Sequence, residues 1–121
     1  MLLALNVSSS PPATAIFRPN CTENNRGIGD VSAASSRHSV SLFWNSPGYL
    51  FQSIHVCYKK NWALVGKCDG GRYQNETYGS PVSNGTITIS GLDSNSCYKF
   101  AVYGVDAGNR LIGMKKIRTN K

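Results

Sequence analysis

The sequence predicts an all-β protein made of antiparallel strands. Short stretches in which apolar and polar residues alternate recur from about residue 29 onward, and this two-residue period is that of a half-buried strand. Turn-forming Gly, Pro, Asn and Asp residues separate the stretches, and no segment of useful length has the period of a helix. A chain of 121 residues suits a single domain. Several short strands at this spacing indicate an antiparallel sandwich or barrel.

The N-terminal part of the chain lacks this regular pattern. We therefore divide the chain into an arm or linker, residues 1–27, and a folded domain, residues 28–121. Inside the arm, the Ser/Pro run at residues 8–12 predicts an extended linker. Residues 13–17 predict a short strand, and residues 24–27 (Asn-Asn-Arg-Gly) predict a turn.

Five strands are predicted in the folded domain. In the first four, apolar residues at every second position are expected to face the core. The predicted strands are residues 39–44, 54–59, 86–90, 98–103 and 111–119. The turns that separate the strands are expected at residues 45–48, 69–71, 91–93 and 106–109.

These segments resemble, in order and spacing, strands of the fibronectin type III domain. Five segments resemble strands B, C, E, F and G of that family, in this order: Ser39–Trp44 with Pro47, Ile54–Tyr58, Thr86–Leu92, Cys97–Val102 and Ile117–Thr119. The resemblance covers residues 29–119. It implies an antiparallel seven-stranded β-sandwich of the immunoglobulin-like type.

The resemblance also implies roles for individual core residues. Tyr98 follows Leu92 by six residues and takes the position of the tyrosine corner, whose hydroxyl group bonds to nearby backbone. Trp44 becomes the central aromatic residue of the core, packed near Tyr58 and Phe100. The residues expected to be buried between the sheets are Trp44, Val56, Tyr58, Leu92, Tyr98, Phe100 and Val102.

The four cysteines, Cys21, Cys57, Cys68 and Cys97, indicate two disulfides. No pair has C-x-x-C spacing and only two histidines are present, so we expect no metal site. Cys57 alternates with buried residues and is expected to point outward, within reach of both Cys68 and Cys97. We favour Cys57–Cys68 with Cys21–Cys97, and the alternative is Cys57–Cys97 with Cys21–Cys68. Two disulfides imply an oxidising compartment.

Asn-x-Ser/Thr sequons agree with an extracellular location. They begin at Asn6, Asn20, Asn75 and Asn84, and N-linked sugars occur on the surfaces of secreted proteins. We therefore expect a glycoprotein that is secreted or forms the ectodomain of a cell-surface protein.

The chain is basic, with a net charge of +7 from 13 Lys and Arg residues against 6 Asp and Glu residues. The alternation turns Lys59, Lys99, Lys116 and Arg118 outward on three strands that are neighbours in the fibronectin type III fold. Such a cluster is a candidate anion-binding site for heparan sulfate or another glycosaminoglycan. We do not expect nucleic acid as the partner, because aromatic residues do not interleave with the basic ones.

The expected function is binding without catalysis. No nucleophile, base and orienting group are grouped in the sequence, so we expect neither enzymatic activity nor a cofactor. No apolar run of about 18 residues is present, so no membrane span is expected. The leading hypothesis is a module for protein–protein or matrix interaction, as in cell adhesion, or a spacer between other modules.

Two alternatives stay open at this level. One is a cytokine-receptor-like ligand-binding domain, although the chain has neither a C-x-W nor a W-S-x-W-S motif. The other is a self-assembling structural subunit, in which the N-terminal arm adds as a strand to the sheet of a second copy.

Overall fold

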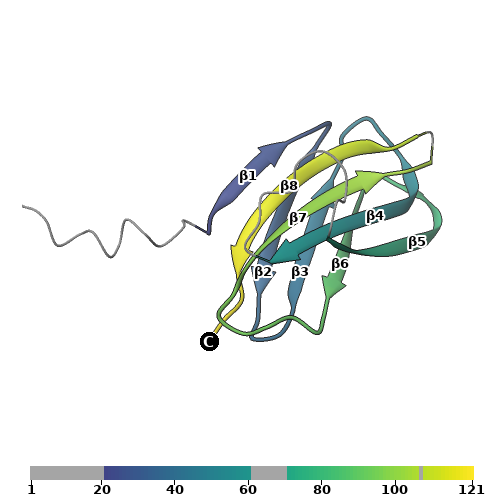
Figure 1. Ribbon diagram of the computed structural model, residues 1–121. Helices are drawn as coiled ribbons and strands as arrows, with labels where there is room; N and C mark the ends of the chain where they lie inside the picture. Colours follow the sequence, from purple (N-terminus) through teal and green to yellow (C-terminus); the bar gives the residue numbers. More distant parts are fainter. Residues whose placement is uncertain (1–20, 61–70, 107) are drawn as a thin grey trace, which may run out of the picture.

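The computed structural model describes residues 21–60, 71–106 and 108–121. These residues form eight strands in two antiparallel sheets that pack face to face (Figure 1). The strands are β1 (Glu23–Arg26), β2 (Asp30–Ser35), β3 (Val40–Asn45), β4 (Phe51–Lys60), β5 (Arg72–Val82), β6 (Asn84–Ile89), β7 (Cys97–Gly104) and β8 (Arg110–Arg118). The larger sheet has the order β1-β8-β7-β4-β5 and the smaller has the order β2-β3-β6.

The predicted all-β sandwich is confirmed, with eight strands where seven were expected. The five strands predicted in the folded domain correspond to β3, β4, β6, β7 and β8. Gly48 and Gly91 lie in predicted turns and have φ angles of 83° and 74°, which glycine adopts without strain. In the part of the chain that is described, no helix is long and apolar enough to cross a membrane.

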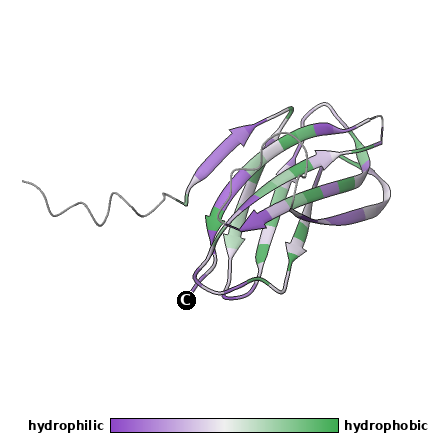
Figure 2. Cartoon of the chain, in the orientation of Figure 1, coloured by the Kyte–Doolittle hydropathy of each residue, from purple (hydrophilic) through white to green (hydrophobic). Residues whose placement is uncertain are grey.

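Strand β1 was not expected, and the predicted turn at residues 24–27 is wrong. Glu23–Arg26 pairs antiparallel with β8 and forms an edge of the larger sheet (Figure 1). The strand is hydrophilic throughout (Figure 2), so it carries no apolar alternation that could have revealed it. It lies inside the segment assigned to the arm, so the sheet begins before residue 28. The predicted linker and strand at residues 8–17 lie outside the described residues, as do Asp69 and Gly70 of one predicted turn.

The chain passes from β1 to the other sheet through Gly27-Ile28-Gly29. The backbone N–H groups of Gly27 and Ile28 donate to the carbonyl groups of Ile112 and Leu111 at 3.0 and 2.9 Å. A Cβ atom on Gly27 would lie 2.0 Å from the Leu111 carbonyl oxygen, so only glycine permits this approach. Strand β2 then pairs with β3 in the smaller sheet.

The sequence also did not indicate strands β2 and β5. Strand β5 pairs with β4, but the register shifts between Phe51, which faces Val82, and Ser53, which faces Thr77. The extra β5 residues at this shift form a bulge. The bulge occurs where Tyr78 packs against the core.

Hydrophobic side chains from both sheets form the core. Six of the seven residues expected to be buried are at most 7% exposed, and Tyr58 is partly buried against them. The tyrosine corner is confirmed, since the Tyr98 hydroxyl group accepts a hydrogen bond from the backbone N–H of Asp93 at 2.9 Å.

The surroundings of Trp44 differ in part from the expectation. Its ring centroid lies 6.4 Å from that of Phe51 and 6.0 Å from that of Tyr78, whereas Tyr58 and Phe100 stack on one another at 5.8 Å. The Trp44 indole N–H donates to the Tyr78 hydroxyl group at 3.0 Å. Burial raises the pKa of Tyr78 and so keeps this hydroxyl group protonated. Trp44 and Phe100 belong to one core cluster with Tyr58 packed against it, as expected, and Tyr78 was missed because it belongs to β5, which the sequence did not indicate.

Replacing the buried acceptor tests this arrangement. Tyr78→Phe leaves the Trp44 N–H group without a partner, and we expect it to lower the free energy of unfolding by about 1–2 kcal/mol in urea denaturation. The control is Tyr73→Phe, which removes the same atom from an exposed position of the same strand. We expect the control to change stability by less than about 0.5 kcal/mol. Equal effects of the two substitutions would contradict the role assigned to Tyr78.

Candidate binding face

The outer face of the larger sheet carries a row of charged residues. The register places Lys59 of β4 opposite Lys99 of β7, Lys99 opposite Lys116 of β8, and Lys116 opposite Glu23 of β1. Neighbouring strands are about 4.8 Å apart, so these four side chains form one continuous line across the sheet. We call Glu23, Lys116, Lys99 and Lys59 the charged row. Arg118 lies two residues beyond Lys116 on β8, on the same face.

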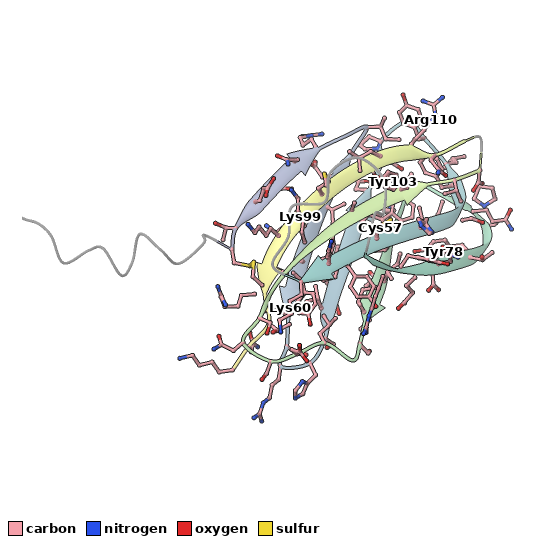
Figure 3. All side chains as sticks on the ribbon, viewed as in Figure 1. Cys57, Lys60, Tyr78, Lys99, Tyr103 and Arg110 are labelled. Carbon is pink, nitrogen blue, oxygen red and sulfur yellow. A yellow bond between two sulfur atoms is a disulfide. The ribbon has the colours of Figure 1, made fainter. Side chains whose placement is uncertain are left out.

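The expectation that Lys99 is a solvent-exposed cation is wrong. Its side chain points to the outer face but is only 7% exposed, and its Nζ atom donates to Glu23 Oε2 at 3.0 Å (Figure 3). The hydrogen bond from Lys99 lowers the pKa of Glu23, and the charges of Lys99 and Lys116 lower it further. The burial of Lys99 was not foreseen because its partner, Glu23, belongs to β1, a strand that the sequence did not indicate.

The other three cations predicted for this site remain partly exposed. Lys59, Lys116 and Arg118 keep part of their side-chain surface in solvent. The Arg118 guanidinium group donates to the Asn95 carbonyl oxygen at 3.4 Å, which is a long contact. The structure thus brings the predicted cations onto one face, where Lys99 is paired with Glu23.

A disulfide joins Cys21 to Cys97, with their Cα atoms 5.7 Å apart. It ties the residues just before β1 to β7, next to the charged row. This bond belongs to the favoured connectivity and is incompatible with the alternative. Cys68, the other member of the favoured Cys57–Cys68 pair, lies outside the described residues.

Cys57 points outward, as expected, but is 1% exposed. Together with Ala101 it forms a second hydrophobic cluster on the outer face of the larger sheet (Figure 3). The partly buried residues packed against the two are Tyr103, Leu111 and Met114. Alternation had suggested a polar outer face, so this cluster could not be seen from the strand patterns alone.

The charged row ends at a pocket of about 250 Å³ near the tyrosine corner. Lys59 lines the pocket, together with Lys60, Arg72 and Asp93. Lys60 and Asp93 form an exposed ion pair at 2.8 Å, and the hydrogen bond from Lys60 lowers the pKa of Asp93. Sequence analysis did not include Lys60 and Arg72, because their contribution depends on how β5 returns beside β4.

The predicted sequons fall into two groups. Asn75 on β5 and Asn84 at the start of β6 are both exposed and accessible to a modifying enzyme. Asn6 and Asn20 lie outside the described residues. Within the described ranges, no group of three or more His, Cys, Asp or Glu side chains is placed to hold a metal ion.

The ion pair between Glu23 and Lys99 predicts a pH dependence of stability. The pKa of Glu23 is lower in the folded protein than in the unfolded chain, so its contribution is complete above the ordinary value near 4.5 and is lost as the pH falls through the folded-state pKa. We expect Glu23→Gln to lower the free energy of unfolding by about 2 kcal/mol at pH 7. The deficit should shrink as the pH falls from the ordinary value through the lowered folded-state pKa of Glu23, because the wild-type carboxylate then becomes protonated as well. A deficit that is the same at pH 7 and pH 3 in urea titrations would contradict the ion pair.

Comparisons with known proteins identify the fold. No protein-family model matches the chain, and no curated protein matches it in sequence. Among solved structures, a myokine structure is 10% identical with a TM-score of 0.59, and the match covers 80% of this chain and 99% of the other. The FN5 domain of Drosophila Lar is 15% identical with a TM-score of 0.51, with 80% and 98% of the two chains covered.

These similarities agree with the strand order that the structure shows. Strands β2, β3 and β6 form one sheet, and β4, β5, β7 and β8 form the other, which β1 extends at its edge. At these levels of identity the comparisons concern the fold and leave the partner open. The chain has the fibronectin type III fold.

Proposed function

We propose that this chain is a non-catalytic binding or spacer module of a secreted protein or of a cell-surface ectodomain. The observation that carries the proposal is a fibronectin type III sandwich stapled by the disulfide between Cys21 and Cys97. Disulfides of this kind persist in oxidising compartments. The sandwich interior is filled by side chains, which leaves no deep cleft for catalysis among the described residues.

We further propose that the outer face of the larger sheet binds a sulfated glycan. The supporting observation is the strand register, which aligns Lys59 and Lys116 in the charged row and leaves Arg118 beside it. Arg72 at the neighbouring pocket adds a cation beyond β4, whereas Lys60 is paired there with Asp93. Cations spaced along a flat sheet suit a polyanionic chain, whose binding weakens as salt screens the charges.

The alternative of a self-assembling subunit uses residues 1–20 as the added strand, and these lie outside the described residues. Residues 23–26 pair with β8 of their own chain, and the disulfide at Cys21 holds them there. An arm that added to β8 of a second copy would first have to displace β1. Nothing in the fold favours the alternative of a cytokine-receptor-like domain over a general binding module.

Heparin affinity tests the proposed glycan site. We expect the triple variant Lys59→Ser, Lys116→Ser, Arg118→Ser to bind heparin roughly tenfold more weakly, because three partly exposed contacts of about 0.5 kcal/mol each sum to about 1.5 kcal/mol. Lys99 is left in place, since its charge is buried against Glu23 and its removal would destabilise the sheet.

A charge-matched variant provides the control for the heparin measurement. Arg37→Ser, Arg110→Ser, Lys121→Ser removes the same net charge from exposed positions outside the charged row. We expect this variant to lose less than about twofold in affinity, since only the general field changes. Equal losses of heparin affinity in the two triple variants would show that binding depends on net charge and not on this site.

The disulfide gives a separate test of the extracellular assignment. The bond closes a sequence separation of 76 residues. The double variant Cys21→Ser, Cys97→Ser should lose about 4 kcal/mol of unfolding free energy, because the unfolded chain regains the entropy of that loop. Peptide mapping of the secreted protein should find Cys21 and Cys97 linked, and finding both as alkylatable thiols would contradict the assignment.

A further inference from the structure

Two exposed aromatic side chains stand on the outer faces of the sheets. Among the described residues, the large hydrophobic side chains with the greatest exposure are Phe43, Tyr49, Leu50 and Tyr73. Tyr49 and Leu50 belong to the loop between β3 and β4, where exposure is ordinary. Phe43 on β3 is 43% exposed and Tyr73 on β5 is 64% exposed, although both lie within strands. Both rings therefore present apolar surface to solvent from within a strand.

Tyr73 lies directly beside a glycosylation sequon. Asn75 follows it by two residues on β5, and Thr77 by four, so the three side chains share one face about 7 Å apart. All three are exposed, whereas Gln74, Glu76 and Tyr78 between and after them are partly buried. A sugar attached to Asn75 therefore begins about 7 Å from Tyr73.

His55 orients this sequon. Its Nδ1–H group donates to the Asn75 Oδ1 atom, and its ring lies 5.1 Å from the Tyr73 ring. The hydrogen bond engages the amide oxygen and does not involve Nδ2, the atom that carries an N-linked sugar. Tyr73, His55 and Asn75 thus lie next to one another on neighbouring strands β4 and β5.

Phe43 lies beside the other described sequon. The register of β3 with β6 places Phe43 opposite Thr86 and Asn45 opposite Asn84. Asn84 is therefore the diagonal neighbour of Phe43 on the same outer face, a separation that an aromatic side chain can span. Asn84 and Thr86, the two ends of the sequon, are both exposed.

We propose that N-linked glycans at Asn75 and Asn84 cover Tyr73 and Phe43, with the first N-acetylglucosamine of each stacked on the aromatic ring. In the transfer, a bond forms between Asn Nδ2 and the anomeric carbon of an oligosaccharide carried on a lipid diphosphate. The bond from that carbon to the diphosphate oxygen breaks, and the amide proton leaves to balance the charge. One face of the pyranose ring presents C–H groups, and its contact with the ring removes apolar area from water.

The positions of the two sequons suggest what the glycans protect. Asn75 lies on β5 and Asn84 on β6, which are the edge strands of the two sheets on the same flank of the sandwich. Among the described residues, the Gln74 side chain donates to the Thr88 carbonyl oxygen at 3.1 Å between these two edges. Exposed edges are open to pairing with another chain unless something blocks them. A branched sugar at each edge blocks strand addition by another chain.

The inference rests on the proposed secretion of the chain, and its test uses the full chain secreted from a eukaryotic host. Peptide mass spectrometry should find sugar on Asn75 and Asn84. Thr77→Val removes the first glycan while keeping Asn75 and its bond to His55, and Thr86→Val removes the second. We expect Thr77→Val to lower the Tm by roughly 4 °C when Tyr73 is present. In a Tyr73→Thr background the same loss of sugar should change the Tm by less than about 1 °C.

The two sites act as controls for one another. Phe43→Thr should abolish the stabilising effect of the Asn84 glycan and leave that of the Asn75 glycan unchanged. Protons of the first N-acetylglucosamine at Asn75 should show upfield ring-current shifts by NMR that disappear in Tyr73→Thr. Equal Tm losses with and without the aromatic residue overturn the stacking. A secreted chain with Cys21 and Cys97 linked but no sugar at Asn75 overturns this inference and leaves the proposed function standing.

Discussion

The indole ring of Trp44 lies between the two sheets, where its N–H group needs an acceptor because a buried donor without a partner costs free energy. Tyr78 supplies that acceptor from β5, and Gly85 leaves room for the pair, since a Cβ atom there would lie 2.4 Å from the Tyr78 hydroxyl oxygen. The Tyr78 side chain points into the core beside the bulge. Because side chains alternate between the two faces of a strand, this contact sets which β5 residues face inward and which face outward. Tyr73 and Asn75 consequently face outward, so one core contact determines what the edge strand displays.

Strand β1 has a comparable influence on the other side of the larger sheet. It has no hydrophobic face of its own, and it is held by backbone pairing with β8, by the disulfide between Cys21 and Cys97, and by the ion pair between Glu23 and Lys99. The Glu23 carboxylate neutralises Lys99, the middle one of three lysines that lie on adjacent strands. The outer face is therefore a mixture of a compensated charge, partly exposed cations and the apolar cluster around Cys57.

The two flanks of the sandwich manage their edge strands in different ways. On one flank, β1 and β2 expose polar side chains, and Arg26 and Asp30 form an exposed ion pair at 3.1 Å. Charged residues on an edge discourage pairing with another chain. On the opposite flank, β5 and β6 carry both described sequons, Asn75 and Asn84. The same physical problem, unpaired backbone groups at a sheet edge, thus accounts for features that are distant in the sequence.

The sequence by itself determined the all-β class, because strands β3, β4 and β6 alternate apolar and polar residues and bury one face each. Its resemblance to the fibronectin type III family predicted the two-layer sandwich and the tyrosine corner at Tyr98. The tertiary structure alone decided the pairing of β1, the course of β5 and the burial of Lys99. Polar edge strands have no hydrophobic period to read, and a charged side chain becomes buried only when a distant residue, here Glu23, arrives to compensate it.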